Sequence, residues 1–299
     1  MIEHIELGDI RYEFAKDFKH DRDIRLSFNQ LTEAVFSFSL ENWYNDGFWG
    51  DYYVPYSLLH NNKVISNVSI NKIQFNIEGE SKTGIQIGTV MTHDKYRNKG
   101  LNRFLMEKVM HEWKDKTDFV YLFANDSVLD FYPKFNFRAV EEYQHSKTID
   151  THNASATWKK LHMEAPVDVD FLMGRIKDSV PIAKIAMQNN TSLIMFYCTT
   201  FKKDSVYYIK ELDVIVIANF EGGTVYLDDI FSINPIEINN VIQSISDKRI
   251  LRVILGFTPL DASGFNKYLL KSTDTLFIQQ DKIEFFLNKH WMFPVLSHA

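Results

Sequence analysis

Residues 88–103, GTVMTHDKYRNKGLNR, contain the side chains and backbone features best suited to bind an anion. The central run Arg97-Asn98-Lys99-Gly100-Leu101-Asn102 stands directly before apolar residues spaced for one face of a helix. Backbone N–H groups at a helix start have no partner within the helix, and the positive end of the helix dipole lies there. Gly100 would let the backbone approach a ligand closely. The segment therefore predicts a site for a pyrophosphate.

This segment and a second one resemble the GNAT superfamily of N-acetyltransferases. The family hallmark is Arg or Gln, two residues, Gly, one residue, then Gly or Ala; Arg97, Gly100 and Asn102 occupy these positions, and Asn102 departs from the pattern. A later family motif runs Asn, a short helix, Phe-Tyr and then Gly-Phe, and residues 125–137 are similar to it. Asn136 replaces the glycine there, and asparagine enters left-handed conformations more readily than most residues.

The resemblance implies a coenzyme A-dependent enzyme that needs no metal. Tyr132 would lie near the coenzyme sulfur and act as general acid, protonating the departing thiolate after an amine attacks the thioester. The cofactor-binding residues would be the strand that offers backbone groups to the pantetheine arm, the pyrophosphate loop and an anchoring asparagine: Val90, Met91, Thr92, Arg97, Asn98, Lys99, Gly100, Leu101, Asn102, Arg103 and Asn125.

The general base is not determined by the sequence. An amine must be neutral to attack, and His93, Asp94, His60 and Glu41 are all candidates to remove its proton or to act through water. A histidine beside a strand end is more often structural. The carboxylate of Ala299, which follows an apolar run, is a further candidate, since the chain terminus enters the catalytic pocket in some multidomain members of this family.

Aromatic residues gather between residues 43 and 56, interleaved with Asp46 and Asp51. In the resembled family the acceptor binds in this region. Aromatic faces attract ammonium groups, so one interpretation is a site for a cationic amine. The other is that these large side chains fill the core.

In the first half of the chain, the hydrophobic periodicity predicts the elements that would position these residues. A helical region over residues 21–43 precedes an antiparallel meander, the loop, a helix that begins near Leu101, and a buried strand. The predicted strands are 10–14, 54–59, 64–77, 85–92 and 119–123, followed by a short helix at 127–134 and a closing strand from 137.

The second half repeats this order. A polar stretch over residues 151–160 predicts a linker, so we expect a GNAT acetyltransferase domain over 1–150 and a degenerate GNAT-like domain over 151–299. Gly223-Thr224-Val225 matches Gly88-Thr89-Val90, and Pro235 then falls opposite Gly100. The expected elements are helices at 169–176 and 236–245 and strands at 193–199, 206–209, 214–220, 224–231 and 251–257. The fold class is α/β (α+β), a GNAT fold with a mixed central sheet, an antiparallel meander and flanking helices, in two tandem copies.

The bulk composition limits partners and compartment. Of 299 residues, 33 are Lys or Arg and 39 are Asp or Glu, giving a net charge of -6 that disfavours nucleic acid and suits a cationic small molecule. The N-terminus lacks a signal-peptide pattern and no apolar run suggests a membrane span. Cys198 is the single cysteine, so an intrachain disulfide is excluded and a cytoplasmic location is expected.

The predicted function is transfer of an acetyl group from acetyl-CoA to a primary amine of a small molecule or peptide, by direct attack in a ternary complex. A non-catalytic module that binds coenzyme A as a sensor or interaction surface is the alternative, and a structural scaffold is a third class. The histidines are scattered and Gly-x-Gly-x-x-Gly is absent, which disfavours a metalloenzyme and a dinucleotide oxidoreductase.

Overall fold

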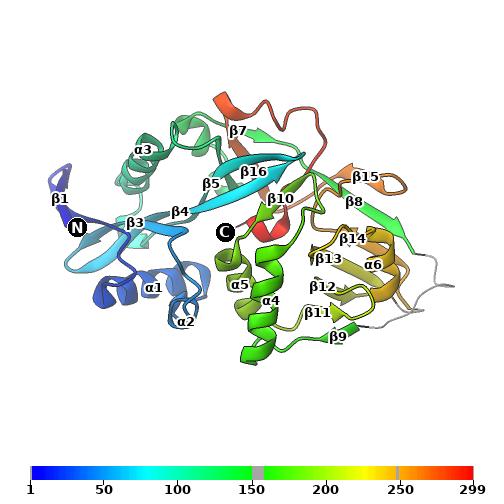
Figure 1. Cartoon of the computed structure of the whole chain (residues 1–299). Helices are drawn as coiled ribbons and strands as arrows, with labels where there is room; N and C mark the ends of the chain where they lie inside the picture. The colour runs from blue at the N-terminus through cyan, green and yellow to red at the C-terminus, as the bar shows by residue number, and fades with distance from the viewer. Residues whose placement is uncertain (1, 150–157, 247–248, 299) are drawn as a thin grey trace.

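Two mixed β-sheets with helices packed against them form the computed structural model, which describes residues 2–149, 158–246 and 249–298 (Figure 1). The first sheet is formed mainly by the N-terminal half of the chain and the second mainly by the C-terminal half. The predicted mixed α/β architecture is confirmed.

The first sheet has the strand order β1-β2-β3-β4-β5-β6-β16-β7, and β10 pairs with the far end of β4. Strands β3 to β5 form the predicted antiparallel meander, β1 and β2 extend it, and β5 and β6 are parallel because a helix connects them. The strands are β1 (Ile2–Leu7), β2 (Ile10–Lys16), β3 (Tyr53–His60), β4 (Lys63–Ile77), β5 (Glu80–Thr92), β6 (Phe119–Asn125), β7 (Phe137–Val140), β10 (Ile185–Gln188) and β16 (Asp274–Gln279).

Helices cover both faces of this sheet. On one face, α3 (Leu101–Trp113) packs its apolar stripe, which includes Leu105 and Val109, against β4, β5 and β6. On the other face lie α1 (Arg22–Phe36) and α2 (Glu41–Asn45). Residues of β6 point alternately to these two cores, which explains why its sequence is an unbroken apolar run.

The second sheet has the order β15-β8-β14-β13-β12-β11-β9, with β13 and β14 parallel. Helix α6 (Ile238–Ile245) covers one face and α4 (Pro166–Asp178) the other. Its strands are β8 (Tyr143–Thr148), β9 (Trp158–Lys160), β11 (Val206–Ile209), β12 (Val214–Glu221), β13 (Thr224–Phe231), β14 (Arg252–Leu255) and β15 (Asn266–Leu269).

The two sheets exchange strands. Strand β8 precedes residue 150 but belongs to the second sheet, whereas β10 and β16 come from the second half and complete the first. The expected domain boundary at 150–151 lies outside the described residues, and no single cut there separates the two sheets. The halves are therefore joined through continuous backbone pairing as well as side-chain packing.

The strand expected at residues 193–199 is wrong, because this segment belongs to helix α5 (Thr191–Thr200). Asn190 caps the helix by accepting a hydrogen bond from Leu193 N at 3.2 Å. The helix lies between the two sheets, with Phe196 in the core of the first and Met195 in a core of the second (Figure 1). A helix buried on all sides shows no helical period in its sequence.

The internal repeat holds at the level of elements. The order β13, α6, β14 with a parallel strand pair matches β5, α3, β6. The tripeptides used to align the halves are not equivalent, however: Gly88 lies inside β5, whereas Gly223 lies in the turn before β13. The repeat is one of topology and not of these particular glycines.

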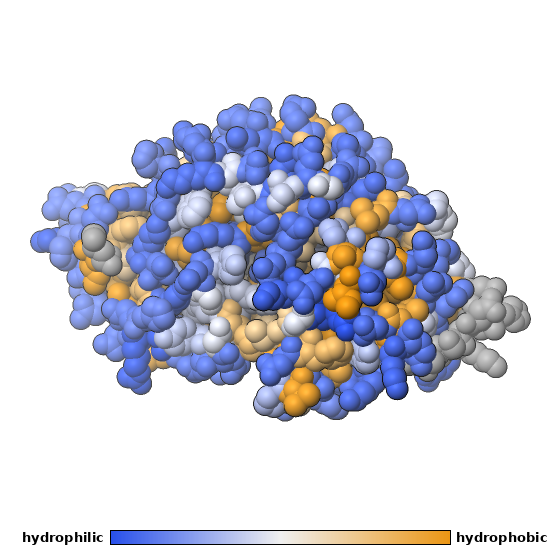
Figure 2. Space-filling view, in the orientation of Figure 1, coloured by the Kyte–Doolittle hydropathy of each residue, from blue (hydrophilic) through white to orange (hydrophobic). Residues whose placement is uncertain are grey.

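None of the described helices is both long and apolar enough to cross a membrane. The face shown in Figure 2 is mostly hydrophilic, with apolar residues in separate patches.

Candidate active site

A pocket of about 640 Å³ opens where β5 and β6 separate. The parallel pairing of these strands ends at Ile87 and Leu122. Beyond that point, residues 88–90 of β5 and 123–125 of β6 line the pocket from its two sides. The predicted elements thus meet at a split in the sheet, which gives a ligand access to backbone groups of β5.

A β-bulge in β5 causes this separation. The register between β4 and β5 shifts between Asn67 and Ser69, and Thr89 adopts a left-handed conformation with φ 49°. The buried amide of Asn67 donates to Thr89 O at 2.9 Å, and the hydroxyl of Tyr53 donates to Thr89 Oγ1 at 2.8 Å. Asn67 and Tyr53 therefore fix the bulge. Neither of them is among the site residues named from the sequence. The signal that could have identified Asn67 is a polar residue within an apolar strand.

The loop before α3 has the backbone expected of an anion site. Gly100 is the N-cap residue in a left-handed conformation, φ 76°, and no side chain caps the helix start. A Cβ built on Gly100 meets nothing within 4 Å, so the space beside the backbone is open to a ligand. Asn98 is also left-handed, with φ 62°.

The charged side chains of the loop are exposed and form local ion pairs. Arg97 binds Asp94 at 2.8 Å and Arg103 binds Glu107 at 2.9 Å. Lys99 lies over the ring of Tyr96. Exposed pairs of this kind contribute little to stability, so these cations could re-pair with an anion at small cost.

Asn102, which departs from the family pattern, is tied to the sheet. Its Oδ1 accepts a hydrogen bond from Ser66 Oγ at 2.6 Å, and Ser66 also bonds Thr92 at 3.0 Å. Asn102 lines the pocket and links the start of α3 to β4 and β5. Leu101 is buried in the core and anchors the loop.

The side chains of the three strand residues that we expect to contact the cofactor point in different directions. Val90 lines the pocket, whereas the Met91 side chain is buried on the opposite face of the sheet, where its sulfur accepts from Thr32 Oγ1 at 3.8 Å. Any contact of Met91 with a cofactor would therefore be made by its backbone. Thr92 is half-buried and is held by Ser66.

Tyr132 and Asn125 both line the pocket. Tyr132 begins the short 3₁₀ helix η3 (Tyr132–Phe135), and burial raises its pKa to about 12. It therefore holds its proton at neutral pH. The Oδ1 of Asn125 accepts from Ser127 N at 3.1 Å and caps η2 (Asp126–Val128), so its side-chain amide nitrogen remains available to a ligand.

None of the four side chains considered as a base lines this pocket. His93 accepts a backbone hydrogen bond at the start of η1 (Asp94–Tyr96), and Asp94 is paired with Arg97. His60 bonds the hydroxyl of Tyr96 at 2.8 Å, and Glu41 is paired with Arg25 at 3.0 Å. Each of these four side chains is thus held by a partner outside the pocket.

The last described residue, His298, does line the pocket, whereas Ala299 lies outside the described residues. The His298 ring stacks on Phe123, and its carbonyl accepts a hydrogen bond from the hydroxyl of Tyr197. Its Nε2 is buried without a partner, and burial lowers its pKa to about 3. The imidazole is therefore neutral at ordinary pH.

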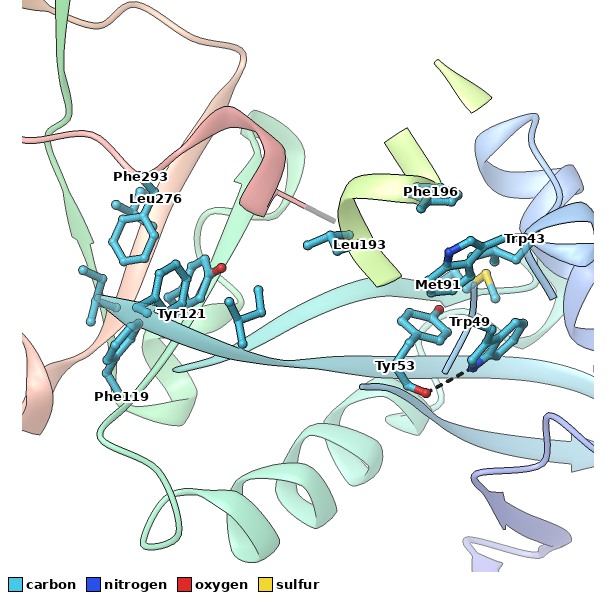
Figure 3. Close-up of a cluster of buried hydrophobic side chains, with 14 of the residues drawn as sticks. Trp43, Trp49, Tyr53, Met91, Phe119, Tyr121, Leu193, Phe196, Leu276 and Phe293 are labelled. Atoms are coloured by element: carbon cyan, nitrogen blue, oxygen red, sulfur yellow. Dashed lines mark hydrogen bonds between the residues drawn. The ribbon is translucent and has the colours of Figure 1, made fainter. Parts of the chain in front are cut away.

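None of the aromatic residues 43–56 lines this pocket, and several of them form core. Trp43, Trp49 and Tyr53 are each less than 4% exposed and pack around one another (Figure 3). The structure therefore supports the core-filling interpretation for these three residues.

The residues present fit coenzyme A. An open, uncapped helix start, exposed cations beside it and a split between two parallel strands are the features that a diphosphate with a long arm requires. Among the described residues, no group of three or more His, Cys, Asp or Glu side chains is placed to hold a metal ion.

Comparison with known proteins agrees with this geometry. Residues 24–140 match the family model of the acetyltransferase (GNAT) domain. Residues 24–140 thus carry a GNAT acetyltransferase domain, whose class of reaction is acyl transfer. A sequence search of curated proteins finds no match.

Solved structures extend the likeness of fold to both halves. A GCN5-related N-acetyltransferase from Kribbella flavida superposes with a TM-score of 0.56 at 13% identity, over 89% of this chain and 71% of that chain. A probable N-acyltransferase from Enterococcus faecalis gives 0.57 at 14%, over 93% and 75%. Eis1 from Mycobacterium abscessus gives 0.56 at 11%, over 91% and 74%. The predicted arrangement of two tandem GNAT-like units is confirmed.

Proposed function

We propose that this protein transfers an acetyl group from acetyl-CoA to a primary amine by direct attack in a ternary complex. The observation that carries the proposal is the pocket itself: Asn102, two residues after the open helix start at Gly100, lines it together with the split between β5 and β6 and with Tyr132. Acetyl-CoA supplies a thioester whose carbonyl carbon the amine attacks.

The chain's own groups would bind and orient the reactants. Backbone N–H groups of residues 98–102 would hold the pyrophosphate, with Arg97, Lys99 and Arg103 adding charge. The backbone of Val90, Met91 and Thr92 would pair with the pantetheine arm on the β6 side of β5, because the pairing of β5 with β6 ends at Ile87. Asn125 would donate a hydrogen bond from its free amide nitrogen.

Tyr132 would hold the proton that the leaving thiolate takes. Burial raises the pKa of Tyr132, and the same desolvation raises the pKa of a thiolate beside it, so the proton can pass between them. None of His93, Asp94, His60 and Glu41 reaches the pocket, which favours a substrate amine that loses its proton to water before it attacks.

The test is replacement of Tyr132 by Phe. We expect kcat for thiol release to fall by roughly 10²–10⁴, the usual cost of a lost general acid, while the dissociation constant for coenzyme A measured by calorimetry stays the same. Arg97→Glu should weaken coenzyme A binding, and Lys114→Glu at the far end of α3 is the matched control.

Two results would change the assignment. Tight coenzyme A binding without turnover of any amine would favour a non-catalytic sensor. Absence of binding by calorimetry would leave a scaffold. Stability is a second measure of binding, because ligand at about 100 times its dissociation constant should stabilise the fold by about 2.7 kcal/mol.

A further inference from the structure

The pocket passes from one face of the first sheet to the other. Tyr132 and Val90 belong to the core on the α3 side, where the cofactor loop lies. Phe38, Phe123 and Phe196 belong to or pack on the opposite core, formed with α1, α2 and α5. All five residues line the same pocket. A second reactant can therefore approach from the face opposite the cofactor.

Aromatic rings form the wall of the pocket on that opposite face. We call this set the aromatic wall, and three of its rings contact one another: Phe38 lies 5.8 Å from Phe196 and 5.6 Å from Phe201, and Phe196 lies 5.6 Å from Phe201. Phe36 stacks on Phe38 at 6.0 Å. The wall consists of Phe36, Phe38, Phe123, Phe196, Tyr197 and Phe201.

Two rings of the wall are left open to solvent. Phe36 is 41% exposed and Phe201 is 54% exposed, although both line the pocket. Large apolar side chains exposed together beside a pocket with a few polar groups are typical of a ligand site. A ligand with an apolar body would cover this surface.

Few charged side chains line the pocket: Asp130, Lys134 and Asp274. The carboxylates that line the pocket are Asp130 and Asp274, and both are exposed. Asp130 lies two residues before Tyr132, whereas Asp274 pairs in register with Asn125 and shares its face of the sheet with Leu276, which is the face of the wall. The wall has the neutral ring of His298 beside it. This arrangement does not favour a polycation, because a polycation needs several carboxylates.

Both halves of the chain hold the wall in place. Trp43 Nε1 donates to Ser192 O at 2.9 Å, and Ser192 Oγ donates to Trp49 O at 3.0 Å, which fixes α5 against α2. Trp43 also contacts Phe196 at 5.3 Å (Figure 3). The degenerate second half therefore contributes directly to the pocket.

We infer that the aromatic wall binds the apolar body of the acceptor and that the acceptor is an aralkylamine, a primary amine carried by a short alkyl chain on an aromatic ring. Offset or edge-to-face contacts would hold the ring. Apolar surroundings lower the pKa of an amine and so favour its neutral, nucleophilic form. This inference rests on the proposed acetyl transfer.

The test compares 2-phenylethylamine with spermidine as acceptors. Acetyl-CoA is the donor, and the rate is measured as thiol release. We expect kcat/KM to be at least about tenfold higher for 2-phenylethylamine, since an apolar pocket separates substrates by about 10–200-fold. Phe201→Ala should raise KM for 2-phenylethylamine about tenfold at unchanged kcat, as loss of uniform binding does. Phe36→Ala is the second variant, and Tyr226→Ala, an exposed aromatic outside the pocket, is the control.

Binding is measured separately by saturation-transfer NMR of 2-phenylethylamine with the coenzyme A complex, and Phe201→Ala should weaken the signal. Preference for spermidine, or KM unaffected by both Phe variants, overturns the inference while leaving acetyl transfer standing. A Phe201→Ala effect that appears only with octanoyl-CoA would assign the wall to the acyl chain and also overturns it. If neither amine reacts although coenzyme A binds, the proposed function fails first.

Discussion

Glu142 is a buried carboxyl group that holds the C-terminal segment, and its replacement by Gln tests how that segment is fixed. Oε1 of Glu142 accepts a hydrogen bond from Phe293 N at 2.8 Å, and Phe293 begins the stretch that ends at His298 in the pocket. A glutamine oxygen can accept the same hydrogen bond without carrying a charge. The substitution therefore removes the ionisation and keeps the contact.

The expected effect depends on pH. Burial raises the pKa of Glu142 from 4.5 to about 8, and the Phe293 amide only partly opposes this. Between these two pH values the folded state holds a proton that the unfolded state has lost. The contribution of this retained proton to the free energy of unfolding is fully present below about pH 4.5. It falls by about 1.4 kcal/mol per pH unit until the pH passes about 8. From about pH 6 to about pH 8, the loss is about 2 kcal/mol.

Urea unfolding at several pH values measures this change. Other buried carboxylates such as Asp229 titrate in the same range, so the quantity to compare is the difference between Glu142→Gln and the unsubstituted chain at each pH. That difference should grow by about 2 kcal/mol in favour of the variant from about pH 6 to about pH 8. Glu141→Gln, an exposed neighbour, is the control. A difference that stays constant with pH would refute the reasoning.

Two further predictions concern the interior. A Cβ at Gly84 would lie 2.8 Å from ring atoms of both Phe119 and Phe75, so Gly84→Ala should destabilise the chain by about 1–3 kcal/mol in urea unfolding, and an unchanged midpoint would contradict it. Cys198 is buried, and burial raises the pKa of its thiol, so iodoacetamide should label it only when denaturant is present; rapid labelling of the native chain would argue against the packing of α5.

The candidate site was predictable where its parts lie close together along the chain. The run from Gly88 to Arg103 gives a strand, a glycine turn and a helix start in direct succession, so local rules set the position of the loop. Tyr132 followed from a short local motif in the same way. Most predicted strands of the first half occur within a few residues of their expected ends.

Other parts of the site depend on contacts between residues far apart in sequence. The bulge at Thr89 is fixed by Tyr53 and Asn67 from neighbouring strands, and no local pattern indicates that pairing. The aromatic cluster of residues 43–56 has the composition of a cation site, yet packing against α5 makes it core. Composition alone does not distinguish the two outcomes.

The sequence by itself determined the class of fold, the helix start at Gly100 and the succession of strand, helix and strand, because backbone propensities and hydrophobic period act over a few residues. The tertiary structure decided that β16 completes the first sheet, that α5 is a helix and that Phe196 and Phe201 face the pocket. These features arise from burial on all sides and from pairing across more than a hundred residues. Long-range pairing of this kind is settled by which surfaces can be covered together, and the local residue pattern does not encode it.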